Sequence, residues 1–355
     1  MNSQCPIPPF NSERVLLGHG GGGLLSQKLL KDVIAFELKE TLLPQNTDAT
    51  YFNLSLPNGF STHQQSELSL TTDSFVVDPI FFPGGDIGKL SIVGTVNDLA
   101  MMGCYPQALS LSFILEEGFL ISDFIKILKS IRDELLNLNI KITCGDTKVV
   151  PCGKADKIYI NTTGVGIRIS PQGWRPQSIQ EGDQIIISRD IACHGLAILN
   201  QRNNLGLSSS ISSDCHELLT PTMALIQEGL EIHCARDLTR GGLVSAIIEI
   251  ASVANKQIEL NEELIPKSPA AQSAAELLGL DLLAIANEGT CIYFLPKECV
   301  SEALRILCSF SFMERAAVIG SVGADSKNGR GLLRLPTGLT RNLKLPPGEV
   351  LPRIC

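Results

Sequence analysis

Residues 81–103 read FFPGGDIGKLSIVGTVNDLAMMG and carry the strongest structural signal in this chain. The PGG triplet breaks the backbone, and residues 86–102 are so uniformly apolar that they predict a helix buried on all sides. Asp98 is the only acid within residues 91–102. A buried carboxylate is costly unless a cation or several donors satisfy it. Asp98 is therefore either a satisfied structural residue or a ligand.

Strand patterns surround this helix. Residues 67–77 (ELSLTTDSFVV) alternate and are rich in β-branched side chains, and residues 108–115 precede an amphipathic helix at 121–138. Two further strands are predicted at 140–150 and 157–169. Strands and helices mix without strict alternation, so the pattern favours an α+β fold.

The segment SPQGWRPQSIQEGD, residues 170–183, is the best candidate for a domain boundary because it combines two prolines with two glycines. Beyond it we predict strands at 184–188, 291–295 and 316–322 and helices at 190–201, 215–229, 241–253, 269–279 and 297–308. The predicted domains are 1–170 and 171–334. Residues 335–355 read as a flexible tail, rich in proline and glycine, that ends in Cys355.

Composition excludes several classes of protein. The chain has 355 residues, 44% of them hydrophobic and 19% charged, and a net charge of -8 without a basic block. No nucleic-acid partner is expected, and a bound polyphosphate would need a cation beside it. The first ten residues do not resemble a signal peptide, and no apolar run is long enough for a membrane span. Eleven scattered cysteines without a C-x-x-C pair suit a reducing, cytoplasmic location.

A glycine run, Gly18–Gly23, follows a short apolar strand predicted at residues 15–17 and precedes a helical pattern. Glycines at such a place let backbone N–H groups approach phosphate. The second strand and acid of a dinucleotide fold do not follow promptly, and no Walker A motif is present. A flexible hinge without a ligand stays open as the alternative.

Two further acids stand in unusual settings. Asp73 lies in the apolar strand TTDSF, and Asp237 lies in RDLTRGG, which we predict to be a turn before a helix. Together with Asp98 they suit Mg²⁺, which prefers a few carboxylates plus phosphate oxygens. For Asp237, a helix cap or an ion pair with a neighbouring arginine is the alternative.

Short strings at GDTK (145–148) and NEG (287–289) could expose Asp146, Lys148 and Glu288 to a ligand, although such strings are usually turns. The histidines at 194, 216 and 233 form no metal-binding pattern and read as ordinary side chains. The thiol of Cys355 stands apart, because a terminal tail of 15 residues can reach about 50 Å and enter a site.

These motifs together resemble the HypE family of hydrogenase maturation carbamoyl dehydratases, within the PurM-like superfamily that includes aminoimidazole ribonucleotide synthetase. The resemblance covers nearly the whole chain. It rests on His19 with the glycine run, DSFVV (73–77), FFPGGDIGKL (81–90), GTVNDLAMMG (94–103), GDTKVV (145–150), RDLTRGG (236–242), ANEG (286–289) and the terminal PRIC (352–355). It implies a PurM-like two-domain architecture: an N-terminal α/β sandwich domain that forms a dimer, a C-terminal α+β domain and a flexible tail.

The resemblance also implies an activity. A carbamoyltransferase, HypF, would load a carbamoyl group onto Cys355, and ATP would drive its dehydration to a thiocyanate that passes to a HypC–HypD scaffold. Asp73, Asp98 and Asp237 would hold Mg²⁺, while Lys148 and Glu288 would activate and deprotonate the carbamoyl group. The residues implied for the ATP pocket are His19, Gly20, Gly21, Gly22, Gly23, Asp73, Lys89, Asn97, Asp98, Asp146 and Asp237.

The sequence departs from the family pattern at three places. Cys193 stands where an acid is usual in a Gly-Asp-His-Gly string, Leu238 replaces a proline, and Thr290 replaces a lysine. Two other functions stay open: a PurM-like ATP-dependent kinase or synthetase that acts on a free small molecule, and a non-catalytic nucleotide-binding adaptor. The kinase or synthetase would need no thiol at the end of the chain, and the carboxylates in apolar settings argue against the adaptor.

Overall fold

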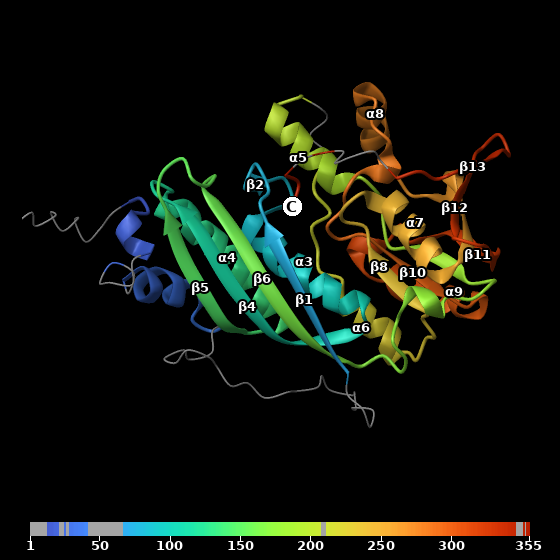
Figure 1. Cartoon of the computed structure of the whole chain (residues 1–355), viewed down its shortest axis with the longest axis horizontal. Helices are drawn as coiled ribbons and strands as arrows, with labels where there is room; N and C mark the ends of the chain where they lie inside the picture. The colour runs from blue at the N-terminus through green and yellow to red at the C-terminus, as the bar shows by residue number, and fades with distance from the viewer. Residues whose placement is uncertain are drawn as a thin grey trace, which may run out of the picture.

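The computed structural model describes residues 13–20, 25, 28–41, 67–206, 211–345, 351 and 353–355. They form two halves, each built on a β-sheet, that lie side by side (Figure 1). The N-terminal half contains β1 (Leu68–Phe75), β2 (Phe81–Phe82), β3 (Gly85–Asp86), α3 (Ile87–Met101), β4 (Cys104–Glu116), α4 (Ile121–Leu138), β5 (Ile142–Val150) and β6 (Ile158–Arg168). It is preceded by the short helices η1 (Leu17–Gly20), η2 (Leu29–Ile34) and α2 (Ala35–Leu38).

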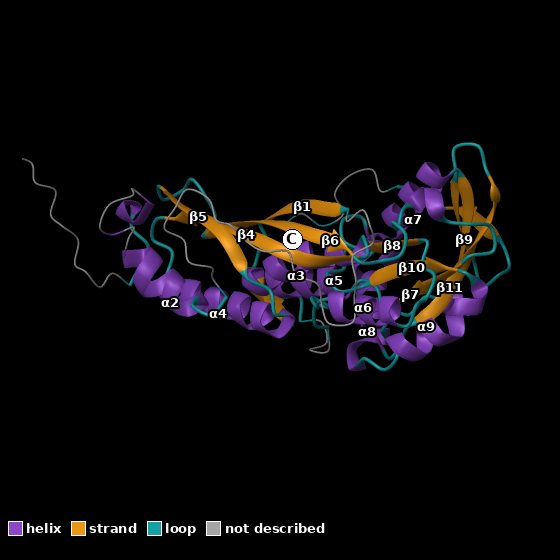
Figure 2. Cartoon of the chain, turned by 90° about the horizontal axis from the view of Figure 1, so that it is seen from below, coloured by secondary structure: helices purple, strands orange, loops and turns teal. Residues whose placement is uncertain are grey.

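The N-terminal sheet has the order β1-β6-β4-β5, with β4 and β5 parallel and the other pairs antiparallel. One face is covered by α3 and α4, which lie on the same side of the strands in Figure 2. The exposed positions of β1 alternate with those that face α3. The opposite face of the sheet is open among the described residues. Each strand therefore has one buried and one outward-facing set of side chains.

The central helix α3 begins where the PGG break ends. Asp86 is its N-cap, and the carboxylate accepts hydrogen bonds from the backbone N–H groups of Gly88 (2.7 Å) and Lys89 (3.2 Å). Every residue of α3 except Lys89 and Asp98 is buried. The expected all-round burial is confirmed, because α3 contacts the sheet, α4 and two elements of the C-terminal half, β8 and α6.

The C-terminal half is built on a seven-stranded sheet with the order β13-β12-β9-β11-β7-β10-β8. Its strands are β7 (Gln184–Ile187), β8 (Cys234–Asp237), β9 (Lys256–Asn261), β10 (Cys291–Leu295), β11 (Ala317–Asp325), β12 (Arg330–Arg334) and β13 (Thr340–Asn342). Its helices of at least eight residues are α5 (Cys193–Asn203), α6 (Leu219–Gln227), α7 (Gly242–Ala254), α8 (Pro269–Leu278) and α9 (Val300–Leu307). α7 packs on β9 and β12, while α9 packs on β7.

The α+β prediction and most predicted elements are confirmed, with corrections at three places. Residues 15–17 do not form a strand: Arg14 makes a single bridge to Leu120, and a 3-10 helix starts at Leu17. Asp237 does not lie in a turn but ends β8, which pairs with β10. Strands β9, β12 and β13 were not predicted from the sequence.

The segment expected to be a tail begins inside the C-terminal sheet. β13 pairs with β12, and Leu343 is buried against the second core. The predicted boundary segment, 170–183, falls between the last strand of one sheet and the first strand of the other. Within the described part of the chain, no helix is both long and apolar enough to cross a bilayer.

Candidate active site between the two domains

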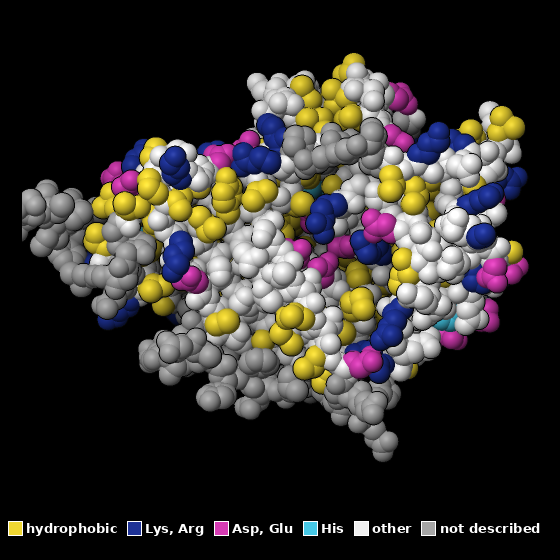
Figure 3. All heavy atoms as spheres, in the orientation of Figure 1, with side chains coloured by type: hydrophobic (Ala, Val, Ile, Leu, Met, Phe, Trp, Pro, Cys, Tyr) yellow, Lys and Arg dark blue, Asp and Glu magenta, His cyan; other side chains and the backbone are white. Residues whose placement is uncertain are grey.

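Four carboxylates from both halves meet at the junction of the two sheets. Asp73 is on β1, Asp98 is on α3, Asp237 ends β8, and Glu288 precedes β10. Two threonines line the N-terminal side of the group: Thr71 donates a hydrogen bond to Asp98 (2.5 Å), and Thr95 donates one to Asp73 (3.3 Å). Acidic side chains are visible near the middle of the face in Figure 3, with arginine or lysine side chains around them.

Burial and the charges of neighbouring acids make Asp73, Asp237 and Glu288 hard to ionise. Burial first, and then the charge of Asp98, raise the pKa of Asp73 to about 6. The same two causes raise the pKa of Asp237 to about 7. The pKa of Glu288 is raised well above its usual value by burial and by the charges of Asp237 and other acids. Arg236 lies 3.9 Å from Asp237 and offsets only part of this rise. Buried acids with raised pKa values are typical of functional sites.

Glu288 is placed by hydrogen bonds to its backbone, while one of its side-chain oxygens, Oε1, is buried without a partner. The carboxylate of Asp214 accepts hydrogen bonds from the N–H groups of Glu288 (3.2 Å) and Gly289 (3.0 Å) and from the hydroxyl of Thr290 (2.7 Å). Asp214 was missed in the sequence, because it precedes the helix predicted at 215–229 and its partners lie 74 to 76 residues away in the chain.

Asn97, which the resemblance places in the ATP pocket, connects the two halves in the structure. Its Nδ2 donates to the backbone carbonyls of His216 (3.1 Å) and Glu288 (3.4 Å), and its Oδ1 accepts from the N–H of Leu218 (2.7 Å). The side chain is buried and its polar atoms are used by these contacts. Asn97 therefore fixes the C-terminal loops to α3, next to Asp98.

The acids fit a magnesium ion only together with further oxygens. Among the described residues, no three His, Cys, Asp or Glu side chains are arranged to hold a metal ion by themselves. Mg²⁺ usually takes one or two carboxylates and completes its shell with water and phosphate oxygens. The mutual repulsion at Asp73, Asp98 and Asp237 would be relieved by a cation, and the unpartnered Oε1 of Glu288 shows that this space is polar.

The end of the tail lies against the N-terminal half, beside the end of β1 (the C label in Figure 1). The N–H of Val76 donates to the carbonyl of Cys355, and the N–H of Asp78 donates to that of Arg353, both at 3.2 Å. Arg353 also pairs with Asp156 (2.7 Å). Cys355 therefore contributes to packing after all, since it contacts the core and its neighbour Ile354 is buried.

This position brings the thiol-bearing residue close to the acids. Val76 is three residues beyond Asp73 in the chain, which corresponds to about 10 Å along a strand. His194, expected to be an ordinary side chain, holds the tail: its Nε2 lies 2.8 Å from the carbonyl oxygen of Ile354. The docked tail thus brings Cys355 to the end of the strand that carries Asp73.

A second set of predicted residues lies elsewhere in the chain. Lys148 and Asp146 are exposed on β5, where they pair with each other at 3.1 Å. Their partners in register on β4 are Ile114 and Ser112, so both point to the open face of the sheet. β5 is three strands from β1, or about 14 Å. In one chain these side chains do not reach the acid group.

His19 and Lys89 are also apart from the acids. His19 is buried in η1, which contacts β5; its Nδ1 accepts a hydrogen bond from the N–H of Leu16 (3.0 Å). Gly20 ends η1, whereas the predicted ligands Gly21, Gly22 and Gly23 lie outside the described residues. Lys89 pairs with Glu134 of α4 (3.6 Å). It precedes Asp98 by nine residues, which puts it on the opposite side of α3.

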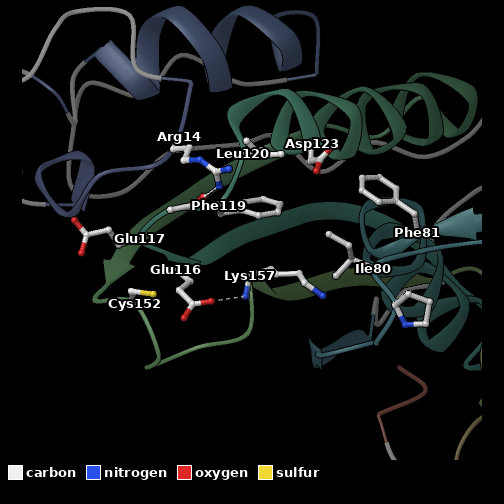
Figure 4. Close-up of a pocket in the computed structure, with 12 residues that line it drawn as sticks. Arg14, Ile80, Phe81, Glu116, Glu117, Phe119, Leu120, Asp123, Cys152 and Lys157 are labelled. Carbon is white, nitrogen blue, oxygen red and sulfur yellow. Dashed lines mark hydrogen bonds between the residues drawn. The ribbon is translucent and has the colours of Figure 1, made fainter. Parts of the chain in front are cut away.

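A surface pocket of about 570 Å³ opens at the start of α4 (Figure 4). Phe81, Phe119 and Leu120 give it an apolar wall, and Lys157 lies at its rim. The ammonium group of Lys157 is 3.7 Å from Asp78, whose backbone also holds the tail. The pocket therefore lies beside the docked tail and contains none of the four carboxylates.

The three departures from the family pattern have structural explanations. Cys193 starts α5 and is largely buried, which raises the pKa of its thiol to about 12 and keeps it neutral. It cannot replace a carboxylate there. Leu238 is buried in the second core, and Thr290 donates to Asp214. None of these positions supplies a charge to the site.

Comparisons with known proteins agree with this geometry. Residues 50–168 match the model for the AIR synthase related protein, N-terminal domain, and residues 180–332 match its C-terminal domain. Carbamoyl dehydratase HypE of Escherichia coli (strain K12) is 37% identical over 341 residues, which cover 96% of this chain and 99% of that protein.

Solved structures give the same result. A crystal structure of hydrogenase maturation protein HypE in complex with ATP matches with a TM-score of 0.88 and 38% identity, covering 96% of this chain and 99% of that one. HypE in a HypE–HypF complex matches with a TM-score of 0.76 and 35% identity, covering 91% and 100%. The expected two-domain AIR synthase-like fold is therefore confirmed.

Proposed function

Because this chain belongs to the family of HypE carbamoyl dehydratases, we propose that it uses ATP to dehydrate a carbamoyl group carried on its own Cys355. The product is a thiocyanate, which supplies the cyanide ligand in the maturation of nickel–iron hydrogenase. The observation that supports this proposal is the docked tail, which holds Cys355 at the end of β1, the strand that carries Asp73.

The reaction removes one oxygen and two protons from the thiocarbamate. The carbamoyl oxygen attacks the γ-phosphorus of ATP, and ADP leaves. The C–O bond then breaks with loss of inorganic phosphate, both nitrogen-bound protons depart, and a C≡N bond forms on the sulfur. Phosphorylation is needed because an amide oxygen is a poor leaving group.

Glu288 is the proposed base for one of these protons. Its side chain is buried with one free oxygen, and its raised pKa makes its carboxylate a better proton acceptor than an exposed one. Asp73, Asp98 and Asp237 would hold Mg²⁺ through their carboxylates. The ion would supply charge neutralisation for the transferring phosphoryl group. Binding it would also relieve the repulsion among these acids.

Lys148 has its proposed role in the site of a second subunit. The open face of the N-terminal sheet exposes Leu68, Leu70 and Ile114, and Lys148 and Asp146 share it. Pairing two such faces into a homodimer would bury these side chains. The pairing would also present Lys148, Asp146 and the segment of His19 to the nucleotide site of the partner.

Mixed dimers test whether Lys148 acts on the partner. A dimer of one Lys148→Ala subunit and one Cys355→Ala subunit keeps one site with an intact thiol and an intact partner lysine. Turnover at that site should be retained if the lysine acts across the interface. Complete inactivity would place Lys148 in the site of its own chain.

HypF is the proposed carbamoyl donor, because a related HypE has been solved with HypF. Release of the product to a HypC–HypD scaffold and a cytoplasmic location complete the proposal. The scaffold follows from the family. The location follows from the chemistry of Cys355, whose thiol must stay reduced to accept a carbamoyl group.

Mass spectrometry of the C-terminal peptide tests the reaction. After incubation with carbamoyl phosphate and HypF, the peptide should gain a carbamoyl group, and it should lose the mass of one water only when ATP is added. Cys355→Ala should abolish both changes but leave ATP binding intact. An ATP-dependent product in solution, with an unchanged peptide, would favour a small-molecule kinase, and no reaction with ATP would favour an adaptor.

A further inference from the structure

The segment Ser213–Cys215 lies where the tail, the N-terminal half and the loop of Glu288 meet. The N–H of Ser213 donates to the carbonyl of Pro83 (2.8 Å), which is part of the PGG break before α3. The segment has neither helical nor strand structure, so these outside contacts determine its conformation.

One side of the segment holds the tail through His194. The carbonyl of Ile354 can only accept, so the Nε2 of His194 donates to it (2.8 Å). Burial lowers the pKa of His194, and in the neutral ring the Nδ1 accepts from the hydroxyl of Ser213 (2.8 Å). The Oγ of Ser213 in turn accepts from the N–H of Cys215 (3.0 Å). The polar chain from the tail to the segment is complete.

The next residue of the segment holds the proposed base. Asp214 accepts from the N–H groups of Glu288 and Gly289 and from the hydroxyl of Thr290. The backbones are so close that a Cβ at Gly289 would overlap the carbonyl oxygen of Asp214. Consequently, the loop that carries Glu288 cannot shift independently of Asp214.

We infer that Ser213 and Asp214 are positioning residues that couple docking of the tail to alignment of Glu288. When the tail leaves, His194 loses the acceptor that fixes its ring, so Ser213 and Asp214 hold the loop of Glu288 less firmly, while Asn97 still connects that loop to α3. The base is therefore best aligned while the thiol and its cargo are in the site. This inference rests on the proposed function, since it gives Glu288 its role.

Two readouts separate docking from chemistry. Hydrogen–deuterium exchange at the amides of Val76 and Asp78 reports docking, because these N–H groups donate to the tail. Single-turnover loss of water from the pre-carbamoylated protein reports alignment. Asp214→Asn should slow dehydration about 10- to 100-fold, since it leaves buried donors unsatisfied. It should also speed exchange at both amides, although its side chain has no contact with the tail among the hydrogen bonds described.

Ser213→Ala, which removes the contact with His194 on the tail side of the segment, should also slow dehydration and speed exchange at both amides. Thr290→Val removes one bond to Asp214 and provides a milder variant if Asp214→Asn does not fold. Thr222→Val is the matched control: it removes a buried hydrogen bond to Tyr293 (2.8 Å) and should leave both readouts unchanged.

The coupling would be overturned if Asp214→Asn slows dehydration but leaves amide exchange normal. If Asp214→Asn does not fold, the same result in Thr290→Val would overturn it. Normal dehydration in these variants would overturn it as well. Failure of the unsubstituted protein to dehydrate its cargo with ATP would instead overturn the proposed function.

Discussion

Buried carboxylates occur in two settings in this molecule. Asp86 and Asp183, in the scaffold, are satisfied: the first caps α3, and the second accepts hydrogen bonds from the N–H of Gln180 (2.8 Å) and from His233 (2.7 Å). Asp237 and Glu288, between the domains, repel other acids. The contrast indicates that the scaffold acids contribute to folding, whereas the junction acids are held in place for a ligand.

Glu288→Gln should produce the largest effect at the junction. The variant keeps the size of the side chain but removes the proton acceptor, so single-turnover dehydration should fall about 10³-fold. Thermal unfolding should be unchanged or shifted upward, because a neutral amide cannot repel the neighbouring acids. A variant that dehydrates at the normal rate would remove Glu288 from the reaction.

Asp98→Asn should reduce magnesium-dependent turnover about 10²-fold, since one proposed carboxylate ligand is lost. Folding should be much less affected, because Thr71 can still hydrogen-bond to the amide oxygen. Turnover measured across a magnesium titration checks this. Equal turnover in the variant and the unsubstituted protein would show that Asp98 is a scaffold acid.

Asp86→Ala should show the reverse behaviour. Losing the cap of α3 and the hydrogen bond from Ser130 should lower the free energy of unfolding by about 2 kcal/mol. Turnover per folded molecule should stay close to normal at low temperature. Denaturant unfolding, together with activity normalised to folded protein, measures both. A large loss of activity with normal stability would contradict the distinction between scaffold acids and junction acids.

His233→Gln should produce the smallest effect. Although burial lowers it, the pKa of His233 is raised overall because Asp183 and Glu231 accept its hydrogen bonds. A raised folded pKa stabilises the protein below the unfolded value of about 6.5, and this stabilisation is lost as pH rises through the folded pKa. In the unsubstituted protein the free energy of unfolding should be about 1 kcal/mol lower at pH 9 than at pH 6. The variant should show no such difference. The same pH dependence in both proteins would contradict it.

The sequence was sufficient to predict the features that depend on local patterns. The apolar run of α3 and the amphipathic pattern of α4 gave both helices, and misplaced acids pointed to Asp73, Asp98 and Asp237. Asp214 and His194 could not be predicted, because their roles come from residues 74 and 160 positions away in the chain. The sides of the sheet taken by Lys148 and Asp73 depend on strand order and register, which a single sequence does not encode locally.

The burial of α3 has a consequence for attempts to divide this protein. The helix packs on the N-terminal sheet and also contacts β8 and α6, and one continuous core includes side chains from both halves. A fragment that ended at the segment between the sheets would expose an apolar surface meant for its neighbour. The two sequence-defined modules therefore form a single cooperative folding unit, and separately expressed pieces should aggregate unless they are produced together.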